Sequence, residues 1–237
     1  MRKSVIDAAA VTGASLTQGR IVAECKYGVM HLDSNAVLWS APERERANRP
    51  LLVLMHGKGA NESDLFGLSP LLPLEPVIAS VRAPLPDGPG FSWFDQAQYV
   101  DGTPTLENAD AAASAVLDWL DGLEYASVSI LGFSQGGAMV LQLLRMAPER
   151  FIGAVNLSGF VVRGTHDGDA AIEALRPPVF WGRGTEDAVL PPRLIDDTID
   201  WLPTHSTLTE RIYEGLGHGV TAAEVKEVGD FLRSCEV

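Results

Sequence analysis

One short stretch of the chain, residues 130–139 with the sequence ILGFSQGGAM, constrains the fold more than any other. An apolar run ends at Gly132, Ser134 follows, and an apolar helical pattern begins at Gly136. Bulky residues two positions before or after the serine would clash with the adjacent strand and helix, so the turn requires glycine there. A Gly-x-Ser-x-Gly turn between a strand and a helix is typical of a nucleophile elbow, which lifts the serine Oγ clear of the sheet. A helix N-cap serine is the simpler alternative, but it does not explain glycine on both sides.

Apolar runs that predict strands alternate with helical patterns over most of the chain. The predicted strands are bounded by proline, glycine or polar turn residues and lie at residues 50–57, 76–84, 126–133, 151–159, 177–184 and 208–215. The predicted helices have apolar positions three and four apart and lie at residues 106–123, 136–146, 194–202 and from 221 onward, where TAAE forms a capping box. This alternation predicts a mostly parallel sheet with helices on both faces, in a single α/β domain over residues 1–237.

The N-terminal part of the chain has a different pattern. Residues 20–32 and 36–42 predict an antiparallel hairpin, which would make the central sheet mixed. Residues 1–18 are weakly patterned, and we expect them to form an N-terminal extension. The apolar run there is too short for a signal peptide and is interrupted by Asp7. Since no stretch reaches the roughly 18 continuous apolar residues that a membrane span needs, we expect a cytoplasmic protein without stable membrane insertion.

The composition disfavours several classes of function. Lysine and arginine total 18 residues, aspartate and glutamate total 31, and the formal net charge is -13. A surface this negative repels phosphate backbones and anionic lipid heads, so we expect no nucleic-acid partner. Cys25 and Cys235 belong to no CxxC pair and cannot hold zinc without histidines nearby, which favours two free thiols in a reducing compartment. We expect neither a cofactor nor a bound metal.

A nucleophilic serine needs a base that is itself oriented by an acid. On a nucleophile-elbow sheet, serine, acid and histidine follow one another in this order along the chain. Of the five histidines, His218 alone follows the last predicted strand, in the glycine-rich loop GLGHGV. The acid should follow the strand at residues 177–184, where Glu186 and Asp187 are both candidates. The acids at residues 196–200 fit the solvated face of the next helix better.

Two backbone N–H groups that stabilise a developing negative charge would complete such a site. One is expected from Gln135, the residue directly after the serine. The other is expected from the loop HGKGANESDL at residues 56–65, which follows an early strand and contains glycines that allow close approach of a ligand. Lys58 would supply this second N–H group.

Six sequence blocks, in order from about residue 49 to the C-terminus, resemble the phospholipase/carboxylesterase family of α/β-hydrolases, which includes bacterial carboxylesterases and acyl-protein thioesterases. The blocks are LMHGKGANESDL, RAPLP with SWFD shortly after, GFSQGGAM, LSGF, GTEDAVLP and GLGHGV. The resemblance implies the α/β-hydrolase fold and favours Asp187 over Glu186 as the acid. It also implies that Val189 and Leu190 line an apolar pocket and that Trp93 lies near the acyl or alcohol site.

Two positions depart from the family pattern. Lys58 stands where relatives more often carry an apolar or aromatic residue, and Arg183 stands where a histidine is common. Both departures concern substrate preference rather than the chemistry. The segment between the strands that end near residue 158 and begin near residue 177 is too short for a large helical lid. We therefore expect an open site that suits short to medium acyl chains or a flexible acyl group.

The leading hypothesis is a serine esterase or thioesterase that cleaves small-molecule esters through an acyl-enzyme. Ser134 would be the nucleophile, His218 the base and Asp187 the orienting acid. The alternative is a non-catalytic hydrolase-fold module that binds a ligand or a partner, although such modules typically lose a triad residue. A dienelactone-hydrolase-like enzyme is less favoured, because the elbow residue is serine and not cysteine. A homodimer is compatible with each hypothesis.

Overall fold

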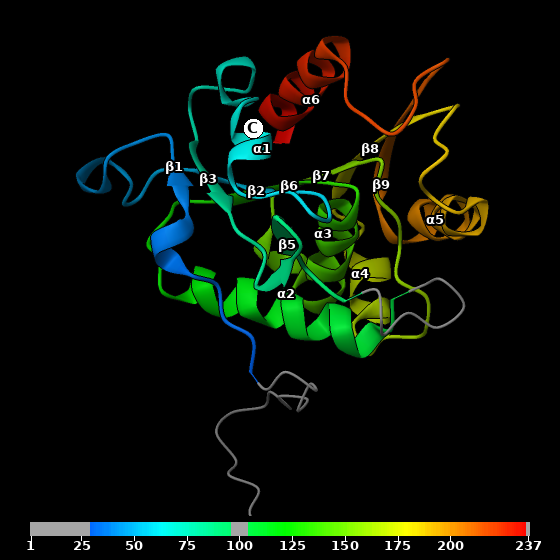
Figure 1. Cartoon of the computed structure of the whole chain (residues 1–237), viewed down its shortest axis with the longest axis horizontal. Coiled ribbons are helices and arrows are strands. Elements are labelled where there is room, and N and C mark those ends of the chain that lie inside the picture. The colour runs from blue at the N-terminus through cyan, green and yellow to red at the C-terminus, as the bar shows by residue number, and fades with distance from the viewer. Residues whose placement is uncertain (1–28, 96–103, 236–237) are drawn as a thin grey trace, which may run out of the picture.

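A computed structural model describes residues 29–95 and 104–235 of the chain. Its centre is a seven-stranded sheet with the strand order β1-β3-β2-β6-β7-β8-β9. The strands are β1 (Leu38–Trp39), β2 (Leu51–Met55), β3 (Val77–Val81), β6 (Val128–Phe133), β7 (Gly153–Leu157), β8 (Pro178–Gly184) and β9 (Thr207–Tyr213). β1 runs antiparallel to β3, and the other neighbouring pairs are parallel. The predicted mixed, mostly parallel sheet is thus confirmed (Figure 1).

Helices cover both faces of this sheet, as the sequence predicts (Figure 1). The α-helices in the described ranges are α1 (Ser63–Phe66), α2 (Leu106–Asp121), α3 (Gln135–Met146), α4 (Asp169–Leu175), α5 (Pro192–His205) and α6 (Ala222–Cys235). Short 3₁₀ turns are η1 (Ser34–Ala36), η2 (Glu43–Glu45), η3 (Ser69–Leu71) and η5 (Pro148–Arg150). Side chains such as Leu117 of α2, Val140 of α3 and Leu194 of α5 share one buried core. The opposite face is covered by α1 and α6, through residues such as Leu65 and Val228.

The second arm of the predicted N-terminal hairpin contains β1, which joins the edge of the central sheet. β1 bonds to β3, with Leu38 opposite Ser80. Most of the other predicted arm, residues 20–28, lies outside the described residues, as does the expected extension at residues 1–18; the described end of the arm, residues 29–32, forms no strand. The pairing has a physical reason, because β3 would otherwise expose the unpaired backbone groups of an open sheet edge.

Several short elements were not predicted. β4 (Leu85–Asp87) and β5 (Gly90–Ser92) form a separate two-stranded antiparallel sheet, and α1 and α4 are helices of only four and seven residues. Elements this short have too few positions for a periodic pattern to develop. Between β7 and β8, where a lid could be inserted, the only α-helix is the seven-residue α4. This agrees with the expected absence of a large lid.

The turn between β6 and α3 shows why its glycines are required. A Cβ atom added to Gly132 would lie 2.1 Å from the carbonyl oxygen of Gly136, and one added to Gly136 would lie 1.9 Å from the carbonyl oxygen of Met55. Both distances are far below a van der Waals contact, so no side chain fits at either position. The first turn of α3 can therefore pack directly on the ends of β2 and β6, and this close packing positions Ser134 at the carboxyl edge of the sheet.

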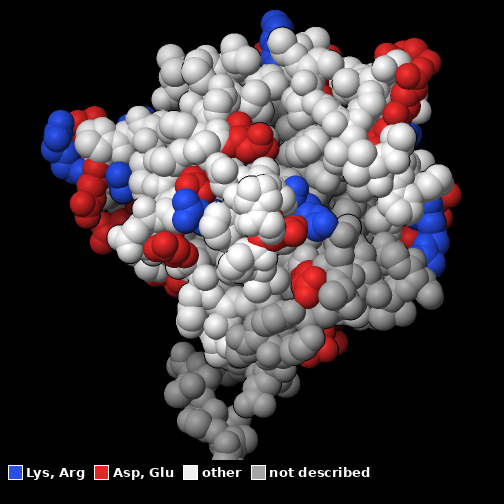
Figure 2. Space-filling view, in the orientation of Figure 1, with Lys and Arg blue, Asp and Glu red and all other residues white. Residues whose placement is uncertain are grey.

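Charged side chains are interspersed over the face of the molecule that Figure 2 shows. Basic groups on this face lie beside acidic ones and form no continuous basic band over the described residues. Ion pairs among the described residues include Arg82 with Glu62 and Arg211 with Glu227.

Candidate active site

Ser134 occupies the tight turn at the carboxyl end of β6. Its backbone has φ 55° and ψ −115°, a conformation that side-chain-bearing residues rarely adopt. Its N–H donates to the Leu157 carbonyl of β7 at 2.8 Å, and its carbonyl accepts from the Ala138 N–H in the first turn of α3 at 3.0 Å. Although Ser134 stands at the N-cap position of α3, its side chain makes no capping hydrogen bond. The Oγ atom is therefore not used by the helix, which argues against the simple N-cap interpretation.

His218 and Asp187 meet Ser134 at the same edge of the sheet. The Nε2 atom of His218 lies 2.9 Å from the Oγ atom of Ser134, and its Nδ1 atom lies 2.6 Å from Oδ2 of Asp187. Asp187 follows β8 and His218 follows β9, so the three side chains come from loops after three different strands. The ring of Phe133 packs against the imidazole with 4.9 Å between ring centroids. Sequence reasoning named all three residues, and the structure brings them together.

The hydrogen bonds around Asp187 define the tautomer of the His218 imidazole. Burial opposes ionisation of this carboxyl group, but hydrogen bonds from His218 and from the backbone N–H groups of Leu190 and Val189 outweigh it and lower the pKa of Asp187. An ionised carboxylate only accepts hydrogen bonds, so Nδ1 of His218 must donate. In the neutral ring, Nε2 then has a lone pair that can accept the hydroxyl hydrogen of Ser134.

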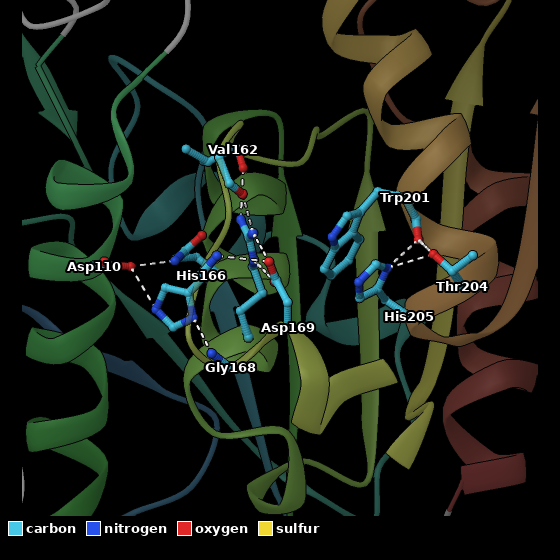
Figure 3. Close-up of polar contacts among 11 residues, drawn as sticks. Asp110, Val162, His166, Gly168, Asp169, Trp201, Thr204 and His205 are labelled. Carbon is cyan, nitrogen blue, oxygen red and sulfur yellow. Dashed lines mark hydrogen bonds and ion pairs between the residues drawn. The ribbon is translucent and has the colours of Figure 1, made fainter. Parts of the chain in front are cut away.

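The neighbouring acid and the other histidines lie away from this contact. Glu186 is exposed, whereas the Asp187 side chain is only 2% exposed and points at His218. His31 is exposed, and His56 is fully buried beneath the loop after β2. His166 and His205 lie beside α2 and at the end of α5 (Figure 3).

In the loop after β2, hydrogen bonds to the Gly57 carbonyl fix the direction of the Gly57–Lys58 peptide group. The Gly57 carbonyl accepts hydrogen bonds from Nδ1 of His56 at 2.7 Å and from the Ala60 N–H at 3.3 Å. In a trans peptide group the C=O and N–H bonds point in opposite directions. The N–H of Lys58, on the other side of this peptide group, therefore points away from His56. The loop adjoins Ser134, because a Cβ atom added to Gly57 would lie 3.5 Å from the Cβ atom of Ser134.

The direction of the Gln135 backbone N–H is set in the same way by its peptide group. The Ser134 carbonyl is directed along α3 by its bond to Ala138. The N–H group of the Ser134–Gln135 peptide must then point in the opposite direction, out of the helix N-terminus. The partial positive charge of that terminus favours an anion there.

The structure changes the interpretation of the expected pocket residues. Trp93 is fully buried, and its Nε1 donates to the His56 carbonyl at 2.8 Å, so its side chain supports the loop after β2 and does not line an open surface. Leu190 is also buried, with its N–H 3.1 Å from Oδ1 of Asp187. Val189 is 65% exposed beside Asp187 and is the member of this group that a ligand could contact directly.

The side-chain ammonium group of Lys58 faces the carboxylate of Asp87. The two charged groups are 3.7 Å apart, and both side chains are about one third exposed, at 37% and 35%. Asp87 belongs to β4 and also accepts a hydrogen bond from Oγ of Ser92 in β5. Sequence reasoning did not find this ion pair, since nothing in the residue pattern relates position 58 to position 87.

The β4–β5 sheet supports the loop that carries Lys58. The Gly59 N–H donates to the Phe91 carbonyl at 2.9 Å, and the Phe91 N–H donates to the Ala60 carbonyl at 2.8 Å. The guanidinium of Arg82 covers the Phe91 ring at 4.6 Å from its centroid. The two backbone bonds with Phe91 hold the loop at Gly59 and Ala60, directly after Lys58.

A separate open cavity of about 310 Å³ lies between α5 and the segment after β7. Its lining includes Arg145, Val162, Trp201 and His205 (Figure 3). Ser134, Asp187 and His218 are not among its lining residues. The cavity therefore does not belong to the site described above.

Other kinds of site are not found among residues 29–95 and 104–235. No group of three histidine, cysteine, aspartate or glutamate side chains in these ranges is arranged to hold a metal ion. Over the same ranges, no helix has the length and apolar character needed to cross a bilayer.

The sheet, together with the strained turn that carries Ser134, is that of an α/β-hydrolase. Within this class, residues 40–236 match the family model described as phospholipase/carboxylesterase, and the chain therefore belongs to that family. The family resemblance of the six sequence blocks is thus confirmed.

Individual relatives agree with this membership. Acyl-protein thioesterase 1 from Kluyveromyces lactis is 23% identical over 205 residues, which cover 77% of this chain and 90% of that protein. Carboxylesterase SOBER1 from Arabidopsis thaliana is 27% identical over 197 residues, which cover 79% and 83%. The crystal structure of a carboxylesterase from Mesorhizobium loti superposes with a TM-score of 0.70 at 20% identity, over 86% of this chain and 99% of that one. The family and these relatives identify a hydrolase of the carboxylesterase and thioesterase type.

Proposed function

We propose that the chain is a serine hydrolase that cleaves carboxylic esters or thioesters through a covalent acyl-enzyme. The observation that carries the proposal is the continuous contact from Oγ of Ser134 to Nε2 of His218 and from Nδ1 to Asp187, at 2.9 and 2.6 Å. A hydroxyl group held at hydrogen-bond distance from an oriented imidazole is the arrangement that nucleophilic catalysis requires.

The reaction follows from these contacts in two halves. Ser134 Oγ attacks the substrate carbonyl carbon while His218 takes its proton, and the carbonyl oxygen becomes an oxyanion. The outward N–H groups of Lys58 and Gln135 stabilise that charge. When the tetrahedral intermediate collapses, the bond to the alcohol or thiol breaks and His218 protonates the leaving group. Water then attacks the acyl-enzyme with His218 as base, which releases the acid and restores Ser134.

The substrate class is supported by the family and by the surroundings of the site. Relatives are named acyl-protein thioesterase and carboxylesterase, which favours small-molecule esters and thioesters here. The short excursion between β7 and β8 and the exposed Val189 favour an open site for short to medium acyl chains. A panel of p-nitrophenyl esters of increasing length, one thioester and one lysophospholipid would define the preference.

The sharpest test of the proposal replaces the nucleophile. We expect Ser134→Ala to lower kcat/KM by about 10⁴-fold or more, because triad members act as one unit, and to leave the circular dichroism spectrum unchanged. A fluorophosphonate probe should label the wild-type chain at Ser134 and should not label this variant. A non-catalytic binding module would show no labelling in either chain, and retained activity in a pure, folded Ser134→Ala sample would contradict the elbow assignment.

A further inference from the structure

The two N–H groups assigned to the oxyanion come from distant parts of the chain, and a buried series of hydrogen bonds joins them. The series begins at the side-chain amide of Gln135, a residue that is 3% exposed. Its Oε1 accepts from the Trp93 backbone N–H at 2.8 Å, and its Nε2 donates to the Phe94 carbonyl at 2.8 Å. The residue whose backbone N–H faces the oxyanion thus clamps the segment after β5 with its side chain.

Trp93 carries the connection across to the other loop. Its backbone is held by Gln135, while its indole Nε1 donates to the His56 carbonyl at 2.8 Å. The Trp93 and His56 rings lie 5.7 Å apart and both are fully buried. Water therefore cannot replace these bonds without opening the core, and losing one leaves a buried polar group unpaired.

His56 completes the connection through a defined tautomer. The Ala83 N–H points at Nε2 of His56 at 3.1 Å, so Nε2 accepts and carries no hydrogen. The ring hydrogen is then on Nδ1, which donates to the Gly57 carbonyl at 2.7 Å. Burial lowers the pKa of His56 and keeps this neutral form. The bond from Nδ1 sets the direction of the Gly57–Lys58 peptide group, and with it the direction of the Lys58 N–H.

We propose that His56, Trp93 and the side chain of Gln135 are positioning residues that set the relative placement of the two oxyanion donors. Their hydrogen-bond series, hereafter the donor-positioning series, runs from the Gln135 amide through Trp93 and His56 to the peptide group of Lys58. It touches neither the reacting carbonyl nor the triad side chains by any of these bonds. The inference rests on the proposed function, because it concerns the same oxyanion.

The proposal makes different predictions for two substitutions of one residue. His56→Leu removes the donor to the Gly57 carbonyl, so the Lys58 N–H loses its direction. We expect kcat to fall about 10- to 100-fold, less than the loss of a whole oxyanion donor, with KM nearly unchanged. In His56→Asn the side-chain amide can again donate from near the position of Nδ1. This variant should recover most of the lost kcat.

The readout that separates positioning from simple destabilisation is affinity for a tetrahedral mimic. A trifluoromethyl ketone with the acyl chain of the assay ester forms a hemiketal oxyanion on Ser134. Its inhibition constant Ki should rise in His56→Leu by about the same factor as kcat/KM falls, as expected when binding energy is lost only in the transition state. Trp93→Phe, which lacks the indole donor, and Gln135→Met, which lacks both amide groups, should move Ki and kcat together in the same direction.

A matched control removes a comparable buried hydrogen bond elsewhere. Oγ1 of Thr198 accepts from the Val161 N–H at 2.9 Å and is fully buried, but it lies on α5 outside the donor-positioning series. Thr198→Val should lower the melting temperature without changing Ki. If His56→Leu, Trp93→Phe and Gln135→Met change Ki and kcat no more than this control does, the proposal is overturned.

Two further outcomes keep the test decisive. The pH profile of kcat/KM should keep the wild-type midpoint in every variant, since His218 is not in the series; a shifted midpoint would overturn the proposal. If His56→Leu does not fold, Trp93→Phe and Gln135→Met carry the same comparison. Failure of the proposed function itself is recognised separately, because the wild-type chain would then show neither esterase activity nor labelling, or Ser134→Ala would remain active.

Discussion

Asp187 and His218 meet at the carboxyl edge of the sheet, whereas Asp110 of α2 and His166 meet beside the helices, in the segment before α4 (Figure 3). Both pairs join an aspartate to an imidazole, although the Asp187 side chain is only 2% exposed and that of Asp110 is 29% exposed. The Asp187–His218 pair is close, at 2.6 Å, and the other pair is 3.6 Å apart. Their surroundings, more than their composition, decide what each pair can do.

The two histidines differ first in the partner of the ring nitrogen that does not face the aspartate. In His218, Nδ1 faces the acid and Nε2 faces the Ser134 hydroxyl. In His166, Nε2 faces Asp110 and Nδ1 accepts the Gly168 N–H at 2.9 Å. Both nitrogens of His166 are therefore engaged by groups that hold the segment before α4 in place. A histidine used in this way has no nitrogen left to take a proton from a nucleophile.

The state of the acid makes the second difference. Burial acts against ionisation of both carboxyl groups. In Asp187 the bonds from His218, Leu190 and Val189 prevail and lower the pKa, whereas in Asp110 burial prevails and raises the pKa. The surroundings of Asp187 thus favour the ionised carboxylate that can hold an imidazole in one tautomer, and those of Asp110 favour that form less. An aspartate–histidine contact therefore indicates catalysis only together with backbone donors on the acid and a hydroxyl group on the far ring nitrogen.

Neutralising each acid in turn tests most directly whether the two aspartate–histidine pairs differ in function. We expect Asp187→Asn to lower kcat by about 10⁴-fold, because the amide favours the wrong tautomer of His218. Glu186→Gln, at the adjacent exposed position, and Asp110→Asn should leave kcat nearly unchanged. Steady-state assays of the three purified variants rank them, and a larger loss for Glu186→Gln than for Asp187→Asn would show that the acid is misassigned.

Glu224 of α6 shows the effect of burial on an acid that has no histidine partner. It is 1% exposed, and burial raises its pKa from 4.5 to about 7. The folded chain thus keeps a proton on Glu224 at pH values where the unfolded chain has lost it. Stability should then be greatest below the unfolded pKa and fall as pH rises through about 7, by a total of about 3 kcal/mol at most.

Glu224→Gln should remove this pH dependence. The amide keeps the shape of the side chain and cannot ionise, so the variant should be more stable than the wild type at pH 8 and similar at pH 5. Urea unfolding at both pH values measures the difference. Equal losses of stability in the two chains between pH 5 and pH 8 would mean that Glu224 does not titrate in this range.

Removing the second histidine tests its structural role. His166→Ala leaves the Gly168 N–H and the Asp110 carboxyl without the imidazole, so the free energy of unfolding should fall by about 1–3 kcal/mol. We expect kcat/KM to stay within about twofold of the wild type, since a purely structural change acts on the folded fraction and not on the barrier. A loss of activity comparable to that of Asp187→Asn would show that the two pairs are functionally coupled.

The smallest effect is expected at the exposed ion pair of Lys58 and Asp87. Because Asp87 already faces the ammonium at 3.7 Å, little charge remains to select an anionic substrate. Lys58→Leu should change kcat/KM by at most several-fold, the effect of about 1 kcal/mol or less. The factor should be the same for a neutral ester and for a carboxylate-bearing ester of equal length. A larger loss on the anionic ester, present at low salt and absent at high salt, would instead give the ammonium a role in selection.

The features that sequence patterns predict well are those set by backbone packing. The glycines around Ser134 and the alternation of strands and helices predicted the α/β-hydrolase fold, which the sheet order and the family match confirm. The roles of Ser134, Asp187 and His218 stay predictions, although their side chains do come together. The choice between Glu186 and Asp187 required the family resemblance, because two adjacent acids have the same chemistry and differ only in which way the chain turns.

The features that sequence reasoning missed depend on direction and on distant contacts. Trp93 was expected near the substrate, but its indole N–H points at the His56 carbonyl from inside the core. The pairing of β1 with β3 was not predicted either, although an open sheet edge offers free backbone groups to such a strand. Such outcomes depend on which partner is in reach after folding, and local periodicity carries no information about that.

The backbone conformation of Ser134 depends on complete folding of the sheet around it. A residue at φ 55° and ψ −115° is less stable than in a relaxed conformation by about 1–3 kcal/mol and persists only where its surroundings impose it. Here the conformation is imposed by the hydrogen bond to Leu157 of β7 and by the close packing of Gly136 on Met55 of β2. In a partly folded chain that lacks either strand, this turn would relax and the Ser134 side chain would lose its position at the carboxyl edge of the sheet. The position of the Ser134 hydroxyl is thus a property of the fully folded chain, and under the proposed function covalent labelling of Ser134 would measure the fraction of native chains.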